Sequence, residues 1–449
     1  MKSSEYIDNE RKSYSLYLIS DRAIPHIADG LKSSIRRILW MARDGKKVKS
    51  SALAGACASI HPHAAPEGPI NTIAAPYGNN IPLLKGYGAF GTLLKPTSYG
   101  ASRYTSVALS EFAKDVIFKD SNLIEMVDNY DGTLKEPKHF IPLIPLVLLN
   151  PQEGIAVGFA SDILPRSISD IITDQICYLK GQSNKIEDVY PSFEPLNQVS
   201  TGPIVDKNGK TRWGFKGAFK KINATTICVT DLPYGLLHKK FTTNLEKLED
   251  SGQVIDVVDD STDTYSIVIK FKKGVLSKLD ESEILKLLGL EILLTENLNV
   301  VNFDGVTVLS TNYVDVITSY TEWRLQYYIA RYQLLSDQLA IEIQRLKDVL
   351  LAIKKNLGSI ARKIESKEEL RLFLEAMGIV HIEYIVDLPV YRFTEGERLK
   401  AETKLAEHEE TFKHYQLVLS SEDERKTIYT TELKEILKKA SANRYVPIE

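Results

Sequence analysis

An arginine directly followed by a tyrosine, Arg103-Tyr104 in the run SRYTS (102–106), is the pair with the most specific chemistry in the chain. A phenol has a pKa near 10, so a tyrosine becomes a nucleophile only where its proton is taken and the developing charge is stabilised. Arginine keeps its charge and can hold a phosphate through a fork of N–H donors. The pair is therefore a candidate for attack on phosphorus, although most of the 22 tyrosines are expected in the core or on the surface.

Two histidines, His61 and His63, flank Pro62. They are candidates for metal ligands, general acids or phosphate contacts, and the alternative is a structural turn around the proline. A His-x-His pair with no cysteine nearby and few carboxylates is a weak metal site. We therefore predict no metal site here.

Basic residues gather in one short stretch. Residues 31–50 contain Asp44 as their one acid and a seven-member set of cations: Lys32, Arg36, Arg37, Arg43, Lys46, Lys47 and Lys49. Residues 397–410 and 422–424 are instead rich in acids. The net charge of the whole chain, −3 from 56 basic and 59 acidic residues, therefore does not exclude a nucleic acid as partner.

Two short helices are expected to position these residues. Apolar residues at i, i+3, i+4 and i+7 predict a helix within 31–43. Its apolar face comprises Ile35, Ile38, Leu39 and Ala42, whereas Arg36, Trp40 and Arg43 fall on the opposite face with Arg37 nearby. A second helix over 50–60 is expected to bury Leu53, Cys57 and Ile60.

Length and composition are those of a globular chain: 449 residues, 43% of them hydrophobic, predict about three domains. The three cysteines fit neither a disulfide framework nor a zinc site. The first residues have no apolar signal-peptide core, and the apolar run at 141–149 is too short to span a bilayer. We therefore expect an intracellular, reduced protein without a membrane partner.

The rest of the chain changes pattern twice. Strands are predicted from about 165 to 310, including 225–235 and 265–271, with Asn208-Gly209 as a hairpin turn. From Val314 an apolar spacing of three and four residues predicts a helix of over forty residues with a coiled-coil-like seam. A compact interval at 358–394 follows. A second helical stretch, from about 395 to 439, can return antiparallel to the first.

Six motifs occur in a fixed order: RAIPHIADGLKSSIRR (22–37), HPH (61–63), GYGAFG (86–91), SRYT, VDNYDGT (127–133) and GIAVGFAS (154–161). This series resembles the breakage-reunion subunit of type IIA DNA topoisomerases, as in gyrase and topoisomerase IV. The resemblance is dense over residues 15–165 and sparser at 229–233 and 388–397. In size the chain is most similar to the medium subunit of T-even-like tailed-phage topoisomerases.

The resemblance implies roles for individual residues. Tyr104 would be the nucleophile that forms a 5′-phosphotyrosyl link, one per protomer, with Arg103 beside it. The residues implied to support the phosphate and the transition state are His61, His63 and Arg22. The residues implied to bind DNA are Lys32, Arg36, Arg37, Lys49 and Ile155. From its sequence context alone, Ile155 is interpreted as an ordinary strand residue. The matching position in the family is an apolar wedge that inserts between base pairs.

The resemblance also implies the fold class, an α+β multidomain protein. A winged-helix breakage-reunion domain would occupy 1–160 and a β-rich tower domain 161–312. Antiparallel coiled-coil arms would occupy 313–449, with a helical dimerisation gate at about 358–394. Asp128 and Asp131 in VDNYDGT are interpreted as parts of a tight turn, not as metal ligands.

The sequence contains no phosphate-binding loop of the Gly-x-x-x-x-Gly-Lys-Ser/Thr type and no Asp-x-Asp cluster. The resemblance therefore implies that ATP and Mg²⁺ are brought by a separate large subunit with an ATPase and a toprim carboxylate cluster. The other expected partners are double-stranded DNA and a second copy of the chain. The expected location is the cytoplasm, which for a phage protein is the cytoplasm of the host. Because the chain ends soon after the second helical stretch, we expect relaxation or decatenation more than supercoiling.

The chain departs from the family pattern in two places. Ala64-Ala65 follows HPH where the family has Gly-Asp, and LKSS (31–34) stands where the family has LKPV. Two other interpretations remain open. One is a noncatalytic architectural DNA-binding protein with a coiled-coil dimeriser, and the other is a coiled-coil scaffold without a DNA role, against which the basic segment argues.

Overall fold

A computed structural model describes residues 10, 14, 17–62, 66–205, 211–262, 264–360 and 363–445. The contacts between residues divide the chain into two compact units. The first contains residues 1–324 and 430–449, and the second contains 325–429.

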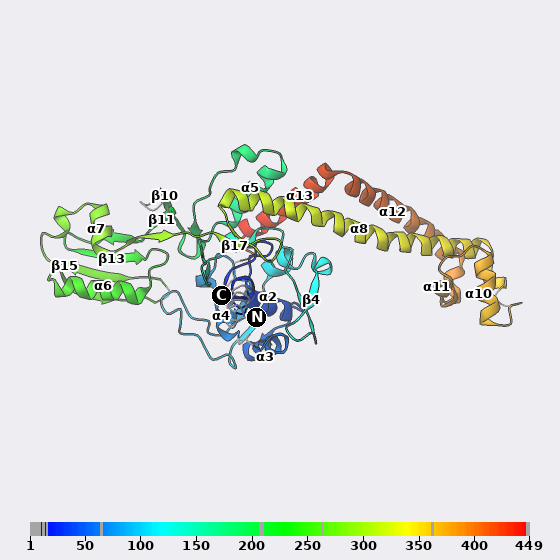
Figure 1. The fold of residues 1–449 in the computed structure, drawn as a ribbon, viewed down its shortest axis with the longest axis horizontal. Coiled ribbons are helices and arrows are strands. Elements are labelled where there is room, and N and C mark those ends of the chain that lie inside the picture. Colours follow the sequence, from blue (N-terminus) through cyan, green and yellow to red (C-terminus); the bar gives the residue numbers. More distant parts are fainter. Residues whose placement is uncertain are drawn as a thin grey trace, which may run out of the picture. The chain divides into compact units, whose positions relative to one another are not determined.

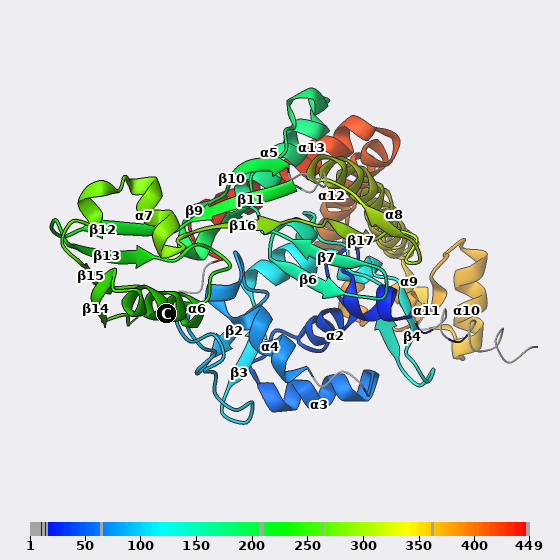
Figure 2. The same cartoon turned by 60° about the vertical axis from the view of Figure 1, so that its left-hand side comes forward.

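The first unit begins with helices around a small antiparallel sheet (Figure 2). The helices are the π-helix η1 (Leu18–Ala23), α2 (Ser33–Met41), α3 (Ser50–Ile60) and α4 (Glu67–Ala74). The sheet has the order β1-β3-β2, with bounds Val48–Lys49, Ser106–Leu109 and Leu84–Tyr87. The long connection from β2 to β3 carries Arg103 and Tyr104.

The apolar faces of α2 and α3 follow the predicted spacing. Ile38 and Leu39 of α2, and all three predicted residues of α3, are buried. Ile35 is only half-buried. The exception is Arg37, which was expected near the solvent face but is 7% exposed. Two acidic residues from other segments account for its burial, as described below.

Three hairpins follow. They are β4–β5 (Met126–Asp128, Lys135–Pro137), β6–β7 (Gln152–Ile155, Ala160–Ile163) and β17–β18 (Asn299–Val301, Val308–Ser310). In the turn between β4 and β5, Asp131 Oδ1 accepts a hydrogen bond from the Thr133 N–H at 3.0 Å, and Gly132 has φ +72°. The predicted tight turn at VDNYDGT is thus confirmed.

The strand-rich part of the first unit contains two larger sheets (Figure 1). The four-stranded sheet has the order β12-β13-β15-β14, with bounds Ala218–Lys221, Thr226–Asp231, Ile267–Phe271 and Val254–Asp259. Its apolar core includes residues of α6 (His238–Asp250) and α7 (Glu281–Leu288). The three-stranded sheet has the order β10-β11-β16, with bounds Thr201–Val205, Thr211–Lys216 and Glu291–Thr295. Between the hairpin β6–β7 and these sheets in the sequence come α5 (Ile168–Leu179) and the paired strands β8 (Ser192–Phe193) and β9 (Gln198–Val199).

The strands predicted at 225–235 and 265–271 are β13 and β15. Asn208-Gly209 lies outside the described residues, but its flanks do pair as the antiparallel strands β10 and β11. The predicted long helix is α8, which runs from Tyr313 to Lys354. Leu357, assigned to the same apolar seam, belongs instead to the short helix α9 (Leu357–Ile360).

The second unit contains most of α8 and all of its antiparallel partner α12 (Glu395–Ser420). Ser336 bonds Gln416 at 2.8 Å, whereas Lys347, further along α8, pairs with the earlier residue Glu409 at 2.8 Å. This order of contacts confirms the antiparallel return. Between the two helices lie α10 (Lys367–Ala376) and α11 (Ile382–Val386), and α13 (Glu422–Ser441) follows α12. The interval has its own buried residues, among them Leu374 and Ile385.

Within the part of the chain that the structure describes, no helix is both long and apolar enough to cross a bilayer. The three cysteines are free thiols. Burial raises the pKa of the Cys57 thiol to about 12, so this cysteine behaves as a small apolar core residue.

Candidate functional site

Tyr104 lies on the loop that leads into β3, and its side chain is 70% exposed. The guanidinium carbon of Arg103 is 4.8 Å from the centre of the Tyr104 ring. The loop is held at the N-terminus of α3, where the N–H groups of Ser50 and Ser51 donate to the carbonyls of Thr105 and Ser102 at 3.1 and 3.2 Å. The first N–H groups of a helix have no partner inside the helix and need acceptors from outside it. The loop supplies two of these acceptors and is thereby anchored to α3. The phenol is thus presented to solvent from a well-anchored backbone.

Lys49 is brought to the same loop by the sheet. It precedes α3 and pairs with Ser106 in the register of β1 and β3, two residues beyond Tyr104. The side chain of Lys49 is exposed. On the other side of the loop, Ser102 Oγ donates to Glu67 Oε1 of α4 at 2.7 Å. The exposed cation Lys49 therefore lies beside the base of the loop, and the loop is bonded to both α3 and α4.

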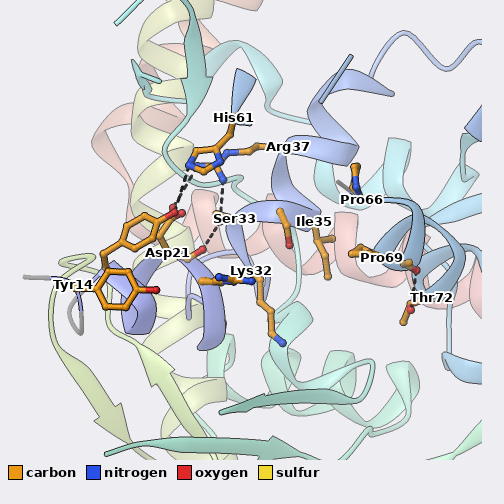
Figure 3. Close-up of a pocket in the computed structure, with 14 residues that line it drawn as sticks. Tyr14, Asp21, Lys32, Ser33, Ile35, Arg37, His61, Pro66, Pro69 and Thr72 are labelled. Carbon is orange, nitrogen blue, oxygen red and sulfur yellow. Dashed lines mark hydrogen bonds and ion pairs between the residues drawn. The ribbon is translucent and has the colours of Figure 1, made fainter. Parts of the chain in front are cut away.

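A cavity of about 600 Å³ lies between η1, α2 and α4 (Figure 3). Four residues predicted to bind phosphate or DNA line it: Arg22, Lys32, Arg37 and His61. The described lining residues do not include Arg103 or Tyr104. The structure thus brings together the N-terminal basic residues and His61, and it holds the tyrosine on a separate surface loop.

His61 is buried at the end of α3 and is held from two directions. The hydroxyl of Tyr17 lies 3.4 Å from His61 Nε2, and the ring of Tyr130 packs edge-on with its centre 5.4 Å away. Next to Tyr130, Asn129 Nδ2 donates to the carbonyl of Ile60 at 3.0 Å. The VDNYDGT turn therefore supports the histidine, a role that sequence reasoning missed although it had singled out the motif. His63 lies outside the described residues.

Arg36 and Arg37 are already paired with carboxylates. Arg36 Nε lies 2.6 Å from Asp29 Oδ2, and Arg37 Nε lies 2.5 Å from Glu136 Oε2. Burial would raise the pKa of Asp29, but the guanidinium of Arg36 outweighs this and holds that pKa below its ordinary value. Arg37 also contacts Asp21 at 3.4 Å. A direct phosphate contact by either arginine stays a prediction, and it would compete with these internal pairs.

Ile155 stands at the end of β6, and its side chain is 89% exposed. The hairpin backbone lies directly against η1 at Gly154. A Cβ at this position would lie 1.9 Å from the carbonyl oxygen of Ala23, so there is no room for a side chain. Arg22 is exposed beside this contact and lines a second cavity of about 480 Å³ together with Lys32 and Ile155. An apolar tip and a cation are therefore presented together, as contact with both bases and phosphates requires.

In the described ranges, no three His, Cys, Asp or Glu side chains are arranged to hold a metal ion. The Asp128 and Asp131 carboxylates are used locally, by Lys135 and by Thr133. The carboxylates of the described residues therefore do not fit a Mg²⁺ site.

Comparison with known proteins gives the class to which this fold and site belong. Residues 22–434 match the family model of the DNA gyrase/topoisomerase IV A-type subunit, and the chain belongs to that family. Three relatives show the range of the family. The chain is 28% identical to the DNA topoisomerase medium subunit of Enterobacteria phage T4, over 96% of this chain and 97% of that protein.

The two bacterial relatives are longer. Identity is 27% to the DNA gyrase A-type subunit of Brachyspira hyodysenteriae over 98% of this chain, and 24% to the DNA topoisomerase 4 A-type subunit of Salmonella typhimurium over 96%. The chain spans 56% and 60% of the length of these two proteins.

Proposed function

We propose that this chain is the DNA cleavage and religation subunit of an ATP-dependent type II topoisomerase, which relaxes or decatenates DNA. The observation that carries the proposal is Tyr104. Within a chain of this gyrase and topoisomerase IV family, it is an exposed tyrosine beside an exposed arginine on an anchored loop.

The proposed reaction is a transfer of the phosphodiester bond. The phenolic oxygen of Tyr104 attacks phosphorus and loses its proton, while the bond from phosphorus to the 3′ oxygen breaks and that oxygen leaves as a hydroxyl after taking up a proton. The product is a 5′-phosphotyrosyl ester, and the reverse attack by the 3′ hydroxyl restores the DNA. Arg103 neutralises charge on the non-bridging oxygens. No free energy is lost to hydrolysis, so religation needs no other energy source.

Other residues support this step in the proposal. Arg22, His61 and His63 bind and stabilise the reacting phosphate, and Lys49 contacts the backbone next to the tyrosine loop. Ile155 enters between base pairs and bends the duplex. The exposure of Arg22, Lys49 and Ile155 supports these three assignments.

The proposed architecture follows the family. Residues 1–160 form the winged-helix cleavage domain, which the helices α2 to α4 and the small β1-β3-β2 sheet support. Residues 161–312 form the tower. Residues 313–449 form the arms, with a dimerisation gate at about 358–394. Two copies would cut both strands, while a separate large subunit binds ATP and supplies Mg²⁺ in the cytoplasm.

The test is the covalent DNA adduct. The chain is incubated with a topoisomerase large subunit, Mg²⁺, ATP and supercoiled DNA, and the reaction is stopped with denaturant to trap protein-linked DNA. We expect Tyr104→Phe to abolish the adduct, because the ring stays in place without its nucleophilic oxygen. Tyr99→Phe, an exposed tyrosine on the same connection, is the matched control and should retain it.

Each outcome separates the alternatives. An adduct that survives in Tyr104→Phe would refute the assignment of the nucleophile. DNA binding without any adduct in the unmodified chain would favour the architectural protein. Strand passage by the purified chain without a large subunit would contradict the proposed partner.

A further inference from the structure

The β6–β7 hairpin that carries Ile155 lies next to β17 (Figure 2), and hydrogen bonds to neighbouring segments fasten both of its strands. On the β7 side, Ser161 Oγ donates to the carbonyl of Asn299 at 2.8 Å, and Asn299 Nδ2 donates to the carbonyl of Ala160 at 2.6 Å. At the tip, Ala156 packs against the buried cluster of Ile19, Ile24 and Val301. The hairpin is thus part of the scaffold and not a free loop.

On the β6 side, Lys32 adds a side-chain hydrogen bond to the backbone contact between Gly154 and Ala23. Its Nζ donates a hydrogen bond to the carbonyl of Glu153, the residue two before Ile155. Lys32 is the residue that precedes α2, and it reaches from the start of that helix to the hairpin. The side chain is half-buried, and burial lowers the pKa of the ammonium group, an effect that the Glu153 carboxylate opposes.

Lys32 therefore differs from the other cations expected to bind DNA. Arg22 and Lys49 are exposed, whereas the ammonium of Lys32 is directed at a backbone carbonyl and lies near a carboxylate. A lysine that binds DNA phosphate displaces condensed counterions and makes affinity dependent on salt. A lysine whose ammonium group is already bonded to a protein carbonyl contributes less to that dependence.

We propose that Lys32 is a positioning residue, which holds the Ile155 hairpin in place for insertion, and not a direct phosphate ligand. This inference rests on the proposed function in so far as DNA is the substrate. An apolar side chain that separates two base pairs must offset an unstacking cost of a few kcal/mol. A hairpin that is already fixed loses little conformational freedom on insertion, whereas a loosened one must be ordered at the same moment.

The first experiment measures the hairpin without DNA, by hydrogen exchange of peptides covering residues 152–163 in the full chain. We expect Lys32→Met to speed this exchange, because it removes the donor to Glu153 but keeps the length of the side chain. Lys32→Arg retains a donor and should restore much of the protection. Lys49→Met, which removes an exposed cation elsewhere, should leave the hairpin unchanged.

The second experiment measures DNA binding and bending by the complex of this chain with its large subunit. The probe is a short duplex with a fluorophore at each end, titrated at several salt concentrations. Loss of one phosphate contact lowers the slope of log affinity against log salt by about 0.9. We expect Lys49→Met to show that change and to keep the bend. Lys32→Met should instead behave like Ile155→Ala, with a weaker bend and an unchanged slope.

The outcomes are distinct. If Lys32→Met lowers the slope as Lys49→Met does and leaves hairpin exchange unchanged, Lys32 is a phosphate ligand and the proposal is wrong. If the unmodified complex neither binds nor bends DNA, the proposed function fails, but the exchange experiment still decides whether Lys32 fastens the hairpin. Lys32→Gln, a smaller polar replacement, substitutes for Lys32→Met in both measurements if the latter does not fold.

Discussion

Charged side chains are used in two different ways in the two units. In the first unit, Arg324 pairs with Asp120, and Arg166 pairs with Glu296. Both arginines are buried, and their partners lie 204 and 130 residues away in the sequence. In the second unit, Arg398 of α12 pairs with its near neighbours Glu395 and Glu402 on the surface. Arg324 and Arg166 therefore tie distant segments together, whereas the pairs of Arg398 stay within one helix.

The physical difference is desolvation. An ion pair inside a protein must compensate for the loss of hydration of both groups, so removal of one partner leaves a costly unpaired charge. An exposed ion pair contributes little to the free energy of unfolding, because water and salt screen the attraction between its two charges. One buried group breaks the contrast between the units. Asp348 of α8 accepts the N–H of Val380 at 3.2 Å and that of His381 at 2.8 Å, and so fixes the start of α11.

The largest effect is expected from Asp120→Asn. The change removes the Asp120 carboxylate from the fully buried Arg324 guanidinium, and we expect the free energy of unfolding of the first unit to fall by about 3–5 kcal/mol. All three tryptophans lie in this unit, so their fluorescence during urea unfolding reports it. The double variant Asp120→Asn, Arg324→Met should recover much of the loss. An unchanged midpoint for the single variant would contradict the comparison.

A smaller effect of opposite sign is expected at Asp162. Burial, together with the carboxylates of Glu153 and Glu296, raises the pKa of Asp162 from 3.8 to about 6. The folded state therefore disfavours the charged form, so the contribution of Asp162 to stability is greatest below pH 4 and is lost as the pH rises through 6.

Asp162→Asn should accordingly stabilise the first unit by about 1 kcal/mol at pH 8, after allowance for its partial exposure, and leave it unchanged at pH 4. The same tryptophan measurement at the two pH values tests this. Asp250→Asn, at the exposed end of α6, is the matched control for the loss of an aspartate. Equal effects of Asp162→Asn at both pH values would remove the titration as the cause.

The smallest effect is expected from Glu402→Gln on α12. It removes one exposed i, i+4 partner of Arg398, and the free energy of unfolding should change by less than about 0.5 kcal/mol. Circular dichroism at 222 nm follows this change, since the second unit is helical. A loss as large as that of Asp120→Asn would mean that the surface pairs of the arms are structurally as important as the buried ones.

The difference between the two kinds of pair also explains what could be predicted from the sequence. The helix α8, the buried residues of α3 and the strands β13 and β15 all follow from local spacing, because a periodic face must find an apolar surface. The burial of Arg37 depends on Glu136, 99 residues away, and leaves no periodic signal. Its exposure was therefore predicted wrongly.

The candidate site divides in the same way. The ordered motifs around Tyr104 and Ile155 identified the family from short stretches of sequence. Asn129 bonds the carbonyl of Ile60, the neighbour of His61, across 69 positions of the sequence, and Lys32 bonds the carbonyl of Glu153 across 121. Sequence identifies which residue types are present in a site, whereas the tertiary contacts decide which of their groups are already engaged.

The close approach of Gly154 to Ala23 has a mechanical consequence. The two backbones are in direct contact, with no side chain between them. Close-packed groups are hardly compressible, so the hairpin is stiff against a force that pushes it toward η1. If the duplex is bent over this hairpin, the elastic energy, of order 1–6 kcal/mol for a bound site, is stored in the DNA. That energy is returned when the duplex straightens.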